Sequence, residues 1–163
     1  MGIFDMFKKN KPQNNGILCP TNGELLEITE VPDEVFSNKI MGDGFAIKSS
    51  DGMIVSPVDA TIEMVFDTKH AIGLKTKEGL EILIHLGIDT VNLKGEGFEV
   101  FVNAGDSVNA GDKLIKMDVD FVQQNAKSDI SPVIFTNLEE NQTVKVITGK
   151  VEAKENNRIE IVK

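Results

Sequence analysis

The sequence predicts an all-β protein, an antiparallel β-sandwich or barrel-like fold with short helical turns. Short runs of β-branched and other apolar residues recur after Cys19, each bounded by Gly, Pro, Asn or Asp. No helical pattern of about 10–15 residues alternates with these runs, which argues against a parallel sheet of βαβ units. The tripeptide Ser56-Pro57-Val58 recurs as Ser131-Pro132-Val133. Repeated turn-then-strand units of this kind are typical of a sandwich with internal pseudo-symmetry.

Each expected strand is a short apolar or alternating run that starts or ends at a turn residue. In chain order the expected strands cover residues 24–29, 44–48, 60–66, 71–75, 80–87, 99–101, 112–117, 133–136, 144–148 and 158–162. Two short helices are expected, residues 33–39 after Pro32 and residues 119–126, because acidic side chains stand at the start of each. These elements predict a single domain, residues 17–163.

Residues 1–16 form a segment of different composition, which we expect to be a flexible N-terminal tail. Ile3 and Phe7 are one helical turn apart, and Lys8 and Lys9 follow them. A short amphipathic helix that makes weak contact with an anionic membrane surface is one interpretation. A frayed tail is the other.

Composition limits the partners and the compartment. The formal net charge of −9 argues against nucleic acid, whose phosphates this surface would repel. The charge favours partners with a basic docking face, or serves solubility alone. Cys19 is the single cysteine, so no intrachain disulfide can form, and no apolar run approaches the ~20 residues that cross a bilayer. We therefore expect a cytoplasmic protein without a secretory signal.

The two histidines, His70 and His85, are the most informative residues, because they lie on either side of an expected hairpin. If Thr76 pairs with Gly79 in the connection, His70 stands directly opposite His85, with Cβ atoms about 4.5–5.5 Å apart. A connection of odd length would place the two imidazoles on opposite faces of the sheet. The first register is the expectation.

Alternation along the second strand of this hairpin predicts which way His85 points. Ile82, Ile84, Leu86 and Ile88 have one parity and are expected to face the core. His85 has the other parity and is expected to lie off the core face. A single histidine in an apolar strand is more often structural than functional, but two that pair across a hairpin favour a site.

Several chemistries are excluded or disfavoured by the residues around this pair. No Gly-x-Ser-x-Gly elbow and no Walker loop occurs, and Cys19 precedes Pro20 far from either histidine. A catalytic zinc site requires three protein ligands, so a carboxylate such as Asp89 would have to complete one. Nucleophilic catalysis by imidazole itself, with a second imidazole as a neighbouring donor, remains.

The stretch from Gly79 to Val91, GLEILIHLGIDTV, resembles the phosphorylation-site signature of glucose-type enzyme IIA, a phosphocarrier of the bacterial phosphoenolpyruvate-dependent sugar phosphotransferase system. Further segments resemble that family in the same order and spacing: residues 31–36, 39–44, 56–59, 68–71, 94–98 and 131–133. The resemblance covers the chain from about Cys19 to its end. It implies an antiparallel β-sandwich with the site in a shallow depression on one sheet.

The resemblance also implies the roles of four residues. His85 would accept a phosphoryl group on Nε2 from the phosphocarrier protein HPr and pass it to a cysteine of a IIB domain, which phosphorylates the incoming sugar. His70 would donate a hydrogen bond to the phosphoryl oxygens. Thr68 would orient His70, and the carbonyl of Gly87 would accept the Nδ1 proton of His85.

Positions that match the family's partner-binding surface are partly apolar and partly acidic. Asp33 and Asp89 match acidic positions that would pair with an arginine of HPr and help to repel the phosphoryl group, although Asp33 is equally suited to cap a helix. The apolar rim positions are Val35, Phe36, Ile40, Phe66, Leu83 and Val91. No cofactor is required, and regulatory targets are conceivable. Zinc held by His70, His85 and a partner's carboxylate would be regulatory.

Two rival interpretations come from other classes of protein. Residues 102–114 resemble the turn-strand unit of biotinyl and lipoyl carrier modules, with Lys116-Met117 as a possible attachment site. The spacing from Gly111 is too short for the biotin motif, and no Glu-Ala-Met precedes the lysine. A zinc peptidase of related shape is disfavoured by the small number of histidines.

Overall fold

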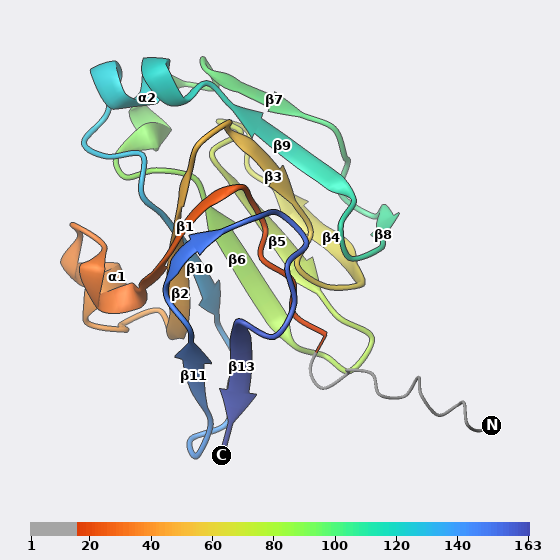
Figure 1. Cartoon of the computed structure of the whole chain (residues 1–163). Helices are drawn as coiled ribbons and strands as arrows, with labels where there is room; N and C mark the ends of the chain where they lie inside the picture. Colours follow the sequence, from red (N-terminus) through yellow and green to blue (C-terminus); the bar gives the residue numbers. More distant parts are fainter. Residues whose placement is uncertain (1–15) are drawn as a thin grey trace.

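The structure, a computed structural model, describes residues 16–163 and consists mainly of antiparallel strands (Figure 1). The predicted membrane-touching tail therefore lies outside the described residues, except for Gly16. The strands are β1 (Gly23–Glu27), β2 (Asp43–Ser49), β3 (Met53–Val55), β4 (Ala60–Val65), β5 (Ala71–Lys75), β6 (Glu81–His85), β7 (Phe98–Val100), β8 (Ser107–Val108), β9 (Lys113–Met117), β10 (Ser131–Phe135), β11 (Thr143–Val146), β12 (Gly149–Val151) and β13 (Ile159–Val162). The helices are α1 (Glu34–Ser37) and α2 (Val119–Asn125), with single turns of 3₁₀-helix, η1 (Ile28–Glu30) and η2 (Thr90–Leu93).

The strands form three sheets. The largest has the order β12-β1-β2-β10-β6-β5-β4-β8, the second is β3-β9-β7, and the third is the β11-β13 pair that projects at the bottom of Figure 1. Every strand pairing is antiparallel. The all-β prediction is confirmed.

The main core lies between the eight-stranded sheet and the β3-β9-β7 sheet. One buried cluster contains Phe45, Ile84 and Phe135 of the large sheet together with Ile54 and Ile115 of the small one. Burial of these side chains provides most of the stabilisation, at about 25 cal/mol per Å² of apolar surface removed from water.

The opposite face of the large sheet is covered only in part. A smaller buried cluster there contains Phe36 of α1, Ala46 of β2 and Ile134 of β10. Leu83 of β6 packs against the same cluster, and Leu83 has the strand parity opposite to Ile82 and Ile84. His85 shares the parity of Leu83, so it faces the side on which α1 packs, as alternation predicted.

All ten predicted strands and both predicted helices are present, with boundaries that differ by up to two residues. Three short strands, β3, β8 and β12, were not expected from the sequence. Asp33 is the N-cap of α1, where its Oδ1 accepts a hydrogen bond of 2.9 Å from the amide of Val35. Asp118 caps α2 in the same way, through the amide of Phe121 at 3.1 Å.

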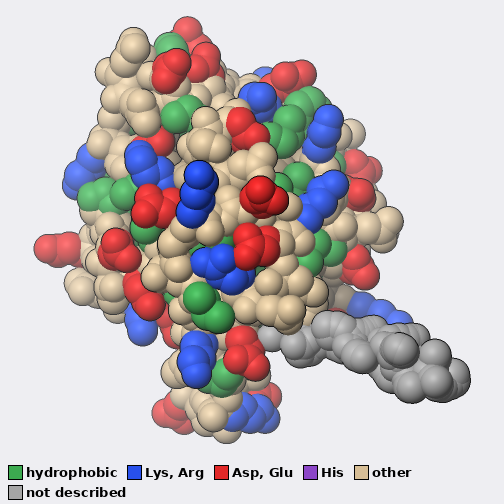
Figure 2. Space-filling view, in the orientation of Figure 1, with side chains coloured by type: hydrophobic (Ala, Val, Ile, Leu, Met, Phe, Trp, Pro, Cys, Tyr) green, Lys and Arg blue, Asp and Glu red, His purple; other side chains and the backbone are tan. Residues whose placement is uncertain are grey.

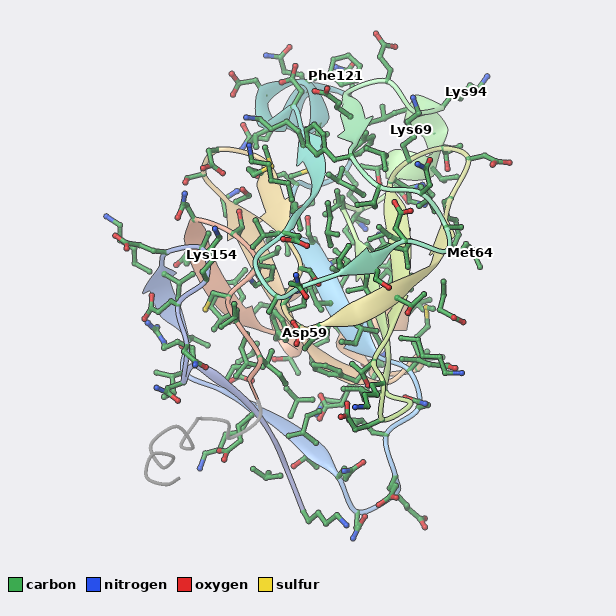
Figure 3. All side chains as sticks on the ribbon, turned by 90° about the vertical axis from the view of Figure 1, so that its right-hand side faces the viewer. Asp59, Met64, Lys69, Lys94, Phe121 and Lys154 are labelled. Carbon is green, nitrogen blue, oxygen red and sulfur yellow. The ribbon has the colours of Figure 1, made fainter. Side chains whose placement is uncertain are left out.

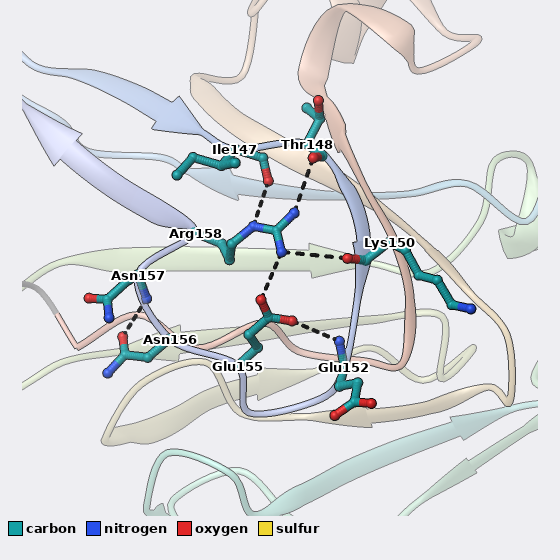
Figure 4. Close-up of polar contacts among 8 residues, drawn as sticks. All are labelled: Ile147, Thr148, Lys150, Glu152, Glu155, Asn156, Asn157 and Arg158. Atoms are coloured by element: carbon teal, nitrogen blue, oxygen red, sulfur yellow. Dashed lines mark hydrogen bonds and ion pairs between the residues drawn. The ribbon is translucent and has the colours of Figure 1, made fainter.

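The connection between β11 and β12 is held by Arg158, the only arginine of the chain (Figure 4). Its guanidinium donates to the carbonyl oxygens of Ile147 at 2.9 Å and Thr148 at 3.0 Å, and to Glu155 Oε2 at 2.7 Å. A planar fork with several fixed donors suits this arrangement better than a lysine ammonium. Arg158 therefore fixes the strand ends that meet at this connection.

Cys19 is fully buried beside the same segment, and its amide donates to the carbonyl of Glu155 at 2.9 Å. Burial, reinforced by the nearby Glu155 charge, raises the pKa of its thiol to about 11. A buried thiol that stays protonated is a poor nucleophile.

On the surface shown in Figure 2, acidic and basic side chains are interleaved. Within residues 16–163, no helix is both long and apolar enough to span a membrane.

Candidate functional site

The hairpin that carries the histidines has a different register from the one predicted. Lys75 pairs with Glu81, and Ala71, rather than His70, pairs with His85. The connection therefore covers residues 76–80, an odd number, and the predicted pairing of Thr76 with Gly79 is wrong. In a regular hairpin this shift would move His70 to the other face.

The two imidazoles nevertheless meet, because His70 precedes β5 and belongs to a tight turn. Lys69, labelled in Figure 3, has a φ of 63°, and its amide donates to the carbonyl of Phe66 at 2.7 Å. The carbonyl of His70 accepts from the amide of Leu86 at 2.7 Å. The left-handed residue reverses the chain and releases His70 from strand alternation. The ring centroids of His70 and His85 are 4.9 Å apart and meet edge to face at 82°.

Each imidazole is held through its Nδ1 atom. Nδ1 of His85 lies 2.8 Å from the carbonyl oxygen of Gly87, and Nδ1 of His70 lies 2.7 Å from Oγ1 of Thr68. A carbonyl oxygen can only accept, so the His85 proton resides on Nδ1 and its Nε2 presents a lone pair. The contacts with Gly87 and Thr68 thus occupy Nδ1 of each ring and leave both Nε2 atoms out of these two bonds.

Burial lowers the basicity of both rings. His70 is 4% exposed, and burial together with the neighbouring His85 lowers its pKa from 6.5 to about 4. Burial also lowers the pKa of the half-buried His85, although its bond to Gly87 and the charges of Asp33 and Asp89 oppose that shift. Both rings are therefore neutral at pH 7.

The predicted rim residues fall into two groups. Phe36 and Phe66 touch the histidines: their ring centroids lie 5.0 Å from that of His85 and 5.4 Å from that of His70, respectively. Phe36 is 6% exposed and is part of the smaller core cluster, and the partly buried Leu83 packs against that cluster. The second group is exposed to solvent: Val35 of α1, Ile40 after α1, and Val91 of η2, at 42%, 69% and 49%.

The acidic residues flank the site at the starts of two short helical turns. Asp33 caps α1 and Asp89 precedes η2, with a φ of 62° at Asp89. Their charges act on His85, which places both carboxylates within electrostatic range of its ring.

The possible metal ligands and Lys116 are the residues on which the rival interpretations depend. Within residues 16–163, no group of three or more His, Cys, Asp and Glu side chains is arranged to hold a metal ion. His70 and His85 thus supply two candidate ligands from this chain. Lys116 lies in β9 between paired strands, opposite Met53 and Glu99, rather than at an exposed turn suited to a tethered arm.

Two buried hydroxyl groups behind the histidines had no predicted role. Ser131 Oγ accepts from the amide of Gly87 at 3.0 Å, and Thr90 Oγ1 donates to the carbonyl of Leu86 at 2.6 Å. Both residues stand in segments that carry the family resemblance. Their contacts, however, depend on the tertiary fold, since Ser131 lies far along the chain from Gly87.

Comparison with known proteins gives a consistent result. Residues 15–141 match the family model described as phosphoenolpyruvate-dependent sugar phosphotransferase system, EIIA 1. The chain is 47% identical over 149 residues to a glucose-specific EIIA component of Bacillus cereus, covering 88% of this chain and 90% of that protein. It is 46% identical over 138 residues to the corresponding component of Staphylococcus epidermidis, covering 85% and 83%. The solved structure of the glucose permease IIA from Mycoplasma capricolum superposes with a TM-score of 0.83 at 42% identity, over 90% of this chain and 94% of that one.

Proposed function

The chain belongs to the EIIA 1 family of the phosphoenolpyruvate-dependent sugar phosphotransferase system, and from this premise we propose that Nε2 of His85 carries its phosphoryl group. Family membership makes the protein a phosphoryl carrier in sugar uptake. The observation that carries the finer proposal is the 2.8 Å bond from His85 Nδ1 to the Gly87 carbonyl, which leaves the Nε2 lone pair free.

The transfer proceeds between three proteins. The Nε2 lone pair of His85 attacks phosphorus on phospho-HPr, the new P–N bond forms, and the bond that joins phosphorus to HPr breaks. In the second step the thiolate of a IIB cysteine attacks the same phosphorus and His85 leaves as neutral imidazole. Such transfers need mainly in-line alignment and stabilisation of the phosphoryl oxygens.

His70 supplies that stabilisation from the neighbouring position. The 2.7 Å contact between Thr68 Oγ1 and His70 Nδ1 is compatible with either donor. For phosphoryl transfer we assign the hydroxyl as the donor, which places the His70 proton on Nε2, where it can be donated to a phosphoryl oxygen. Its pKa of about 4 in the unphosphorylated chain keeps the ring neutral before transfer, so His70 meets the incoming phosphoryl group as a neutral N–H donor.

The exposed rim supports docking of both partner proteins. Val35, Ile40 and Val91 offer apolar contact and exclude water from the transfer. Asp33 and Asp89 would attract a basic side chain of HPr, consistent with the net charge of −9 on this chain. After transfer, the same carboxylates repel the phosphoryl dianion towards its acceptor.

Reconstituted transfer tests the assignment. Incubation with labelled phosphoenolpyruvate, enzyme I and HPr should give one acid-labile, alkali-stable phosphate per chain. His85→Ala should abolish the label, whereas His70→Gln should accept phosphate and pass it to a IIB domain poorly. Retained labelling of His85→Ala would move the acceptor elsewhere, and normal onward transfer by His70→Gln would remove the role of His70.

A regulatory zinc site is a second proposal for the same pair. Zinc would need the lone pairs of both Nε2 atoms, so His70 would have to take the other tautomer and donate its Nδ1 proton to Thr68 Oγ1, and two imidazoles do not complete the four ligands that zinc prefers. A partner's carboxylate would supply a third. Calorimetric titration with zinc should then show tight binding only in the presence of that partner.

A further inference from the structure

The peptide unit between Leu86 and Gly87 is held at both ends by buried hydroxyl groups. Thr90 Oγ1 donates to the carbonyl of Leu86 at 2.6 Å, and Ser131 Oγ accepts from the amide of Gly87 at 3.0 Å. Thr90 is 0% exposed and Ser131 is 1% exposed. Water therefore does not compete for either bond.

The direction of the Ser131 hydroxyl is determined by a second contact. Ser131 Oγ lies 3.0 Å from the carbonyl oxygen of Asp129, which can only accept, so the serine proton points to Asp129. The remaining lone pairs of Oγ face the Gly87 amide. The result is a directed chain from Gly87 N–H to Ser131 O–H to the Asp129 carbonyl.

The next peptide unit, between Gly87 and Ile88, is oriented as well. The amide of Ile88 donates to the carbonyl of Ser128 at 2.9 Å, and the Gly87 carbonyl at the other end accepts from His85 Nδ1. Gly87 itself has a φ of 73°, and an added Cβ would lie 2.7 Å from Thr90 Cγ2 and 2.8 Å from the Ser128 carbonyl oxygen. The turn is thus tightly packed, and its two peptide planes have fixed directions.

From this arrangement we infer that Ser131 and Thr90 are positioning residues that aim the Gly87 carbonyl at His85 Nδ1 and so select the tautomer with a free Nε2. The functional consequence rests on the proposed role of His85. The Gly87 carbonyl belongs to the next peptide unit, so loosening the Leu86–Gly87 peptide acts on it through the φ of Gly87: a change in that angle moves the carbonyl off the line to His85 Nδ1, and the proton is then free to move to Nε2. His85 then loses the nucleophilic lone pair of Nε2.

The chain offers a matched control for Ser131. Ser56 occupies the first position of the same Ser-Pro-Val tripeptide, is 0% exposed, and donates to the carbonyl of Val58 at 2.6 Å. Ser56→Ala therefore removes an equally buried hydroxyl and its bond without touching the turn behind His85. Any loss of stability that comes simply from removing a buried serine hydroxyl will therefore appear in both variants.

The first measurement is the ¹⁵N chemical shift of the His85 ring nitrogens in the full chain at pH 7.5. In the wild type, Nδ1 should have the shift of a protonated nitrogen and Nε2 that of an unprotonated one. Ser131→Ala should move both shifts towards a mixture of tautomers, while Ser56→Ala should leave them unchanged. Thr90→Val, which keeps the shape and removes the hydroxyl, should act like Ser131→Ala, and Thr90→Ser should remain close to the wild type.

The second measurement is the initial rate of phosphorylation by phospho-HPr. We expect Ser131→Ala and Thr90→Val to slow it roughly 5–30-fold, as expected when about one buried hydrogen bond is lost, with the final label still one phosphate per chain. Ring shifts like those of the wild type in both Ser131→Ala and Thr90→Val would overturn the inference. A wild-type chain that takes no label would refute the proposed function instead, and the ring shifts would still test the positioning.

Discussion

Lowering the pH should destabilise the folded protein through His70. In the folded state its pKa is about 4, whereas in the unfolded chain it is close to the ordinary value of 6.5. The unfolded state therefore binds a proton as the pH falls through 6.5, while the folded state stays neutral. The stabilisation is complete above about pH 6.5 and is lost progressively as the pH falls towards 4.

The size of the effect follows from these two values. Between pH 7 and pH 5, linkage gives a loss of about 2 kcal/mol in the free energy of unfolding from His70 alone. This is a large part of the stability of an ordinary domain. His85, whose pKa is also lowered by burial, adds to the loss in the same direction.

Urea unfolding at the two pH values measures the effect, followed by circular dichroism because the chain has no Trp or Tyr. His70→Gln should lose about 2 kcal/mol less between pH 7 and pH 5 than the wild type does. His85→Gln is the comparison variant and should retain most of the contribution of His70, because burial is the larger cause of the lowered His70 pKa and the neighbouring His85 the smaller one. An equal loss in wild type and His70→Gln would refute the reasoning that burial keeps this ring neutral.

Three further predictions concern the Gly87 backbone behind His85, the Arg158 contacts at the β11–β12 connection, and the exposed apolar rim of the site. Gly87→Ala should cost more than about 2 kcal/mol in the free energy of unfolding, because its φ is 73° and the new methyl meets Thr90 and Ser128. Arg158→Lys should cost about 1–3 kcal/mol, because a lysine cannot reproduce the bonds to several carbonyl groups and Glu155. Ile40→Ser should leave stability within about 0.5 kcal/mol of the wild type, since the side chain is 69% exposed, and should slow phosphorylation by HPr severalfold.

Two of these predictions have a control variant in the same chain, and each of the three has an outcome that would contradict it. Gly79 has a φ of 98°, and no atom lies within 4 Å of an added Cβ. Gly79→Ala should therefore lower the free energy of unfolding by only about 1 kcal/mol, the effect of the positive φ alone. If Gly87→Ala lowers the free energy of unfolding no more than Gly79→Ala does, the packing argument fails.

Ile147 is the control for Ile40. It is 58% exposed in the β11–β12 connection, and Ile147→Ser should not slow phosphorylation. Equal slowing by Ile40→Ser and Ile147→Ser would exclude a docking role for Ile40. A fully stable Arg158→Lys would show that one ammonium suffices at this connection.

Local patterns predicted most of the elements but not the way in which they pair. Alternation in residues 80–87 correctly placed His85 on the face opposite Ile82 and Ile84, because side-chain direction in a strand depends only on parity. The register of the hairpin was wrong by one residue, because the connection is one residue longer at Leu80 than the sequence suggested. The strands β3, β8 and β12 escaped detection because runs of two or three residues carry no periodic signal.

The meeting of the histidines was predicted for an incorrect reason. Cross-strand pairing does not bring His70 to His85; a turn with a left-handed Lys69 does. Lysine is not a residue that marks such a conformation, as glycine or asparagine would be. The resemblance to glucose-type enzyme IIA assigned Thr68 to orient His70 and the Gly87 carbonyl to accept the Nδ1 proton of His85, and in the structure each lies at hydrogen-bond distance from Nδ1 of its histidine.

By itself, the sequence determined the strand-rich class of this protein, the identity of its two histidines and the family to which it belongs, because these depend on residue type and local spacing. The tertiary structure alone decided which atoms hold the histidines and how strongly their surroundings lower each pKa. The contacts of Ser131 with Gly87 and of Phe36 with His85 join segments far apart in the chain. Hydrogen bonding and burial depend on distance in space, which no local pattern encodes.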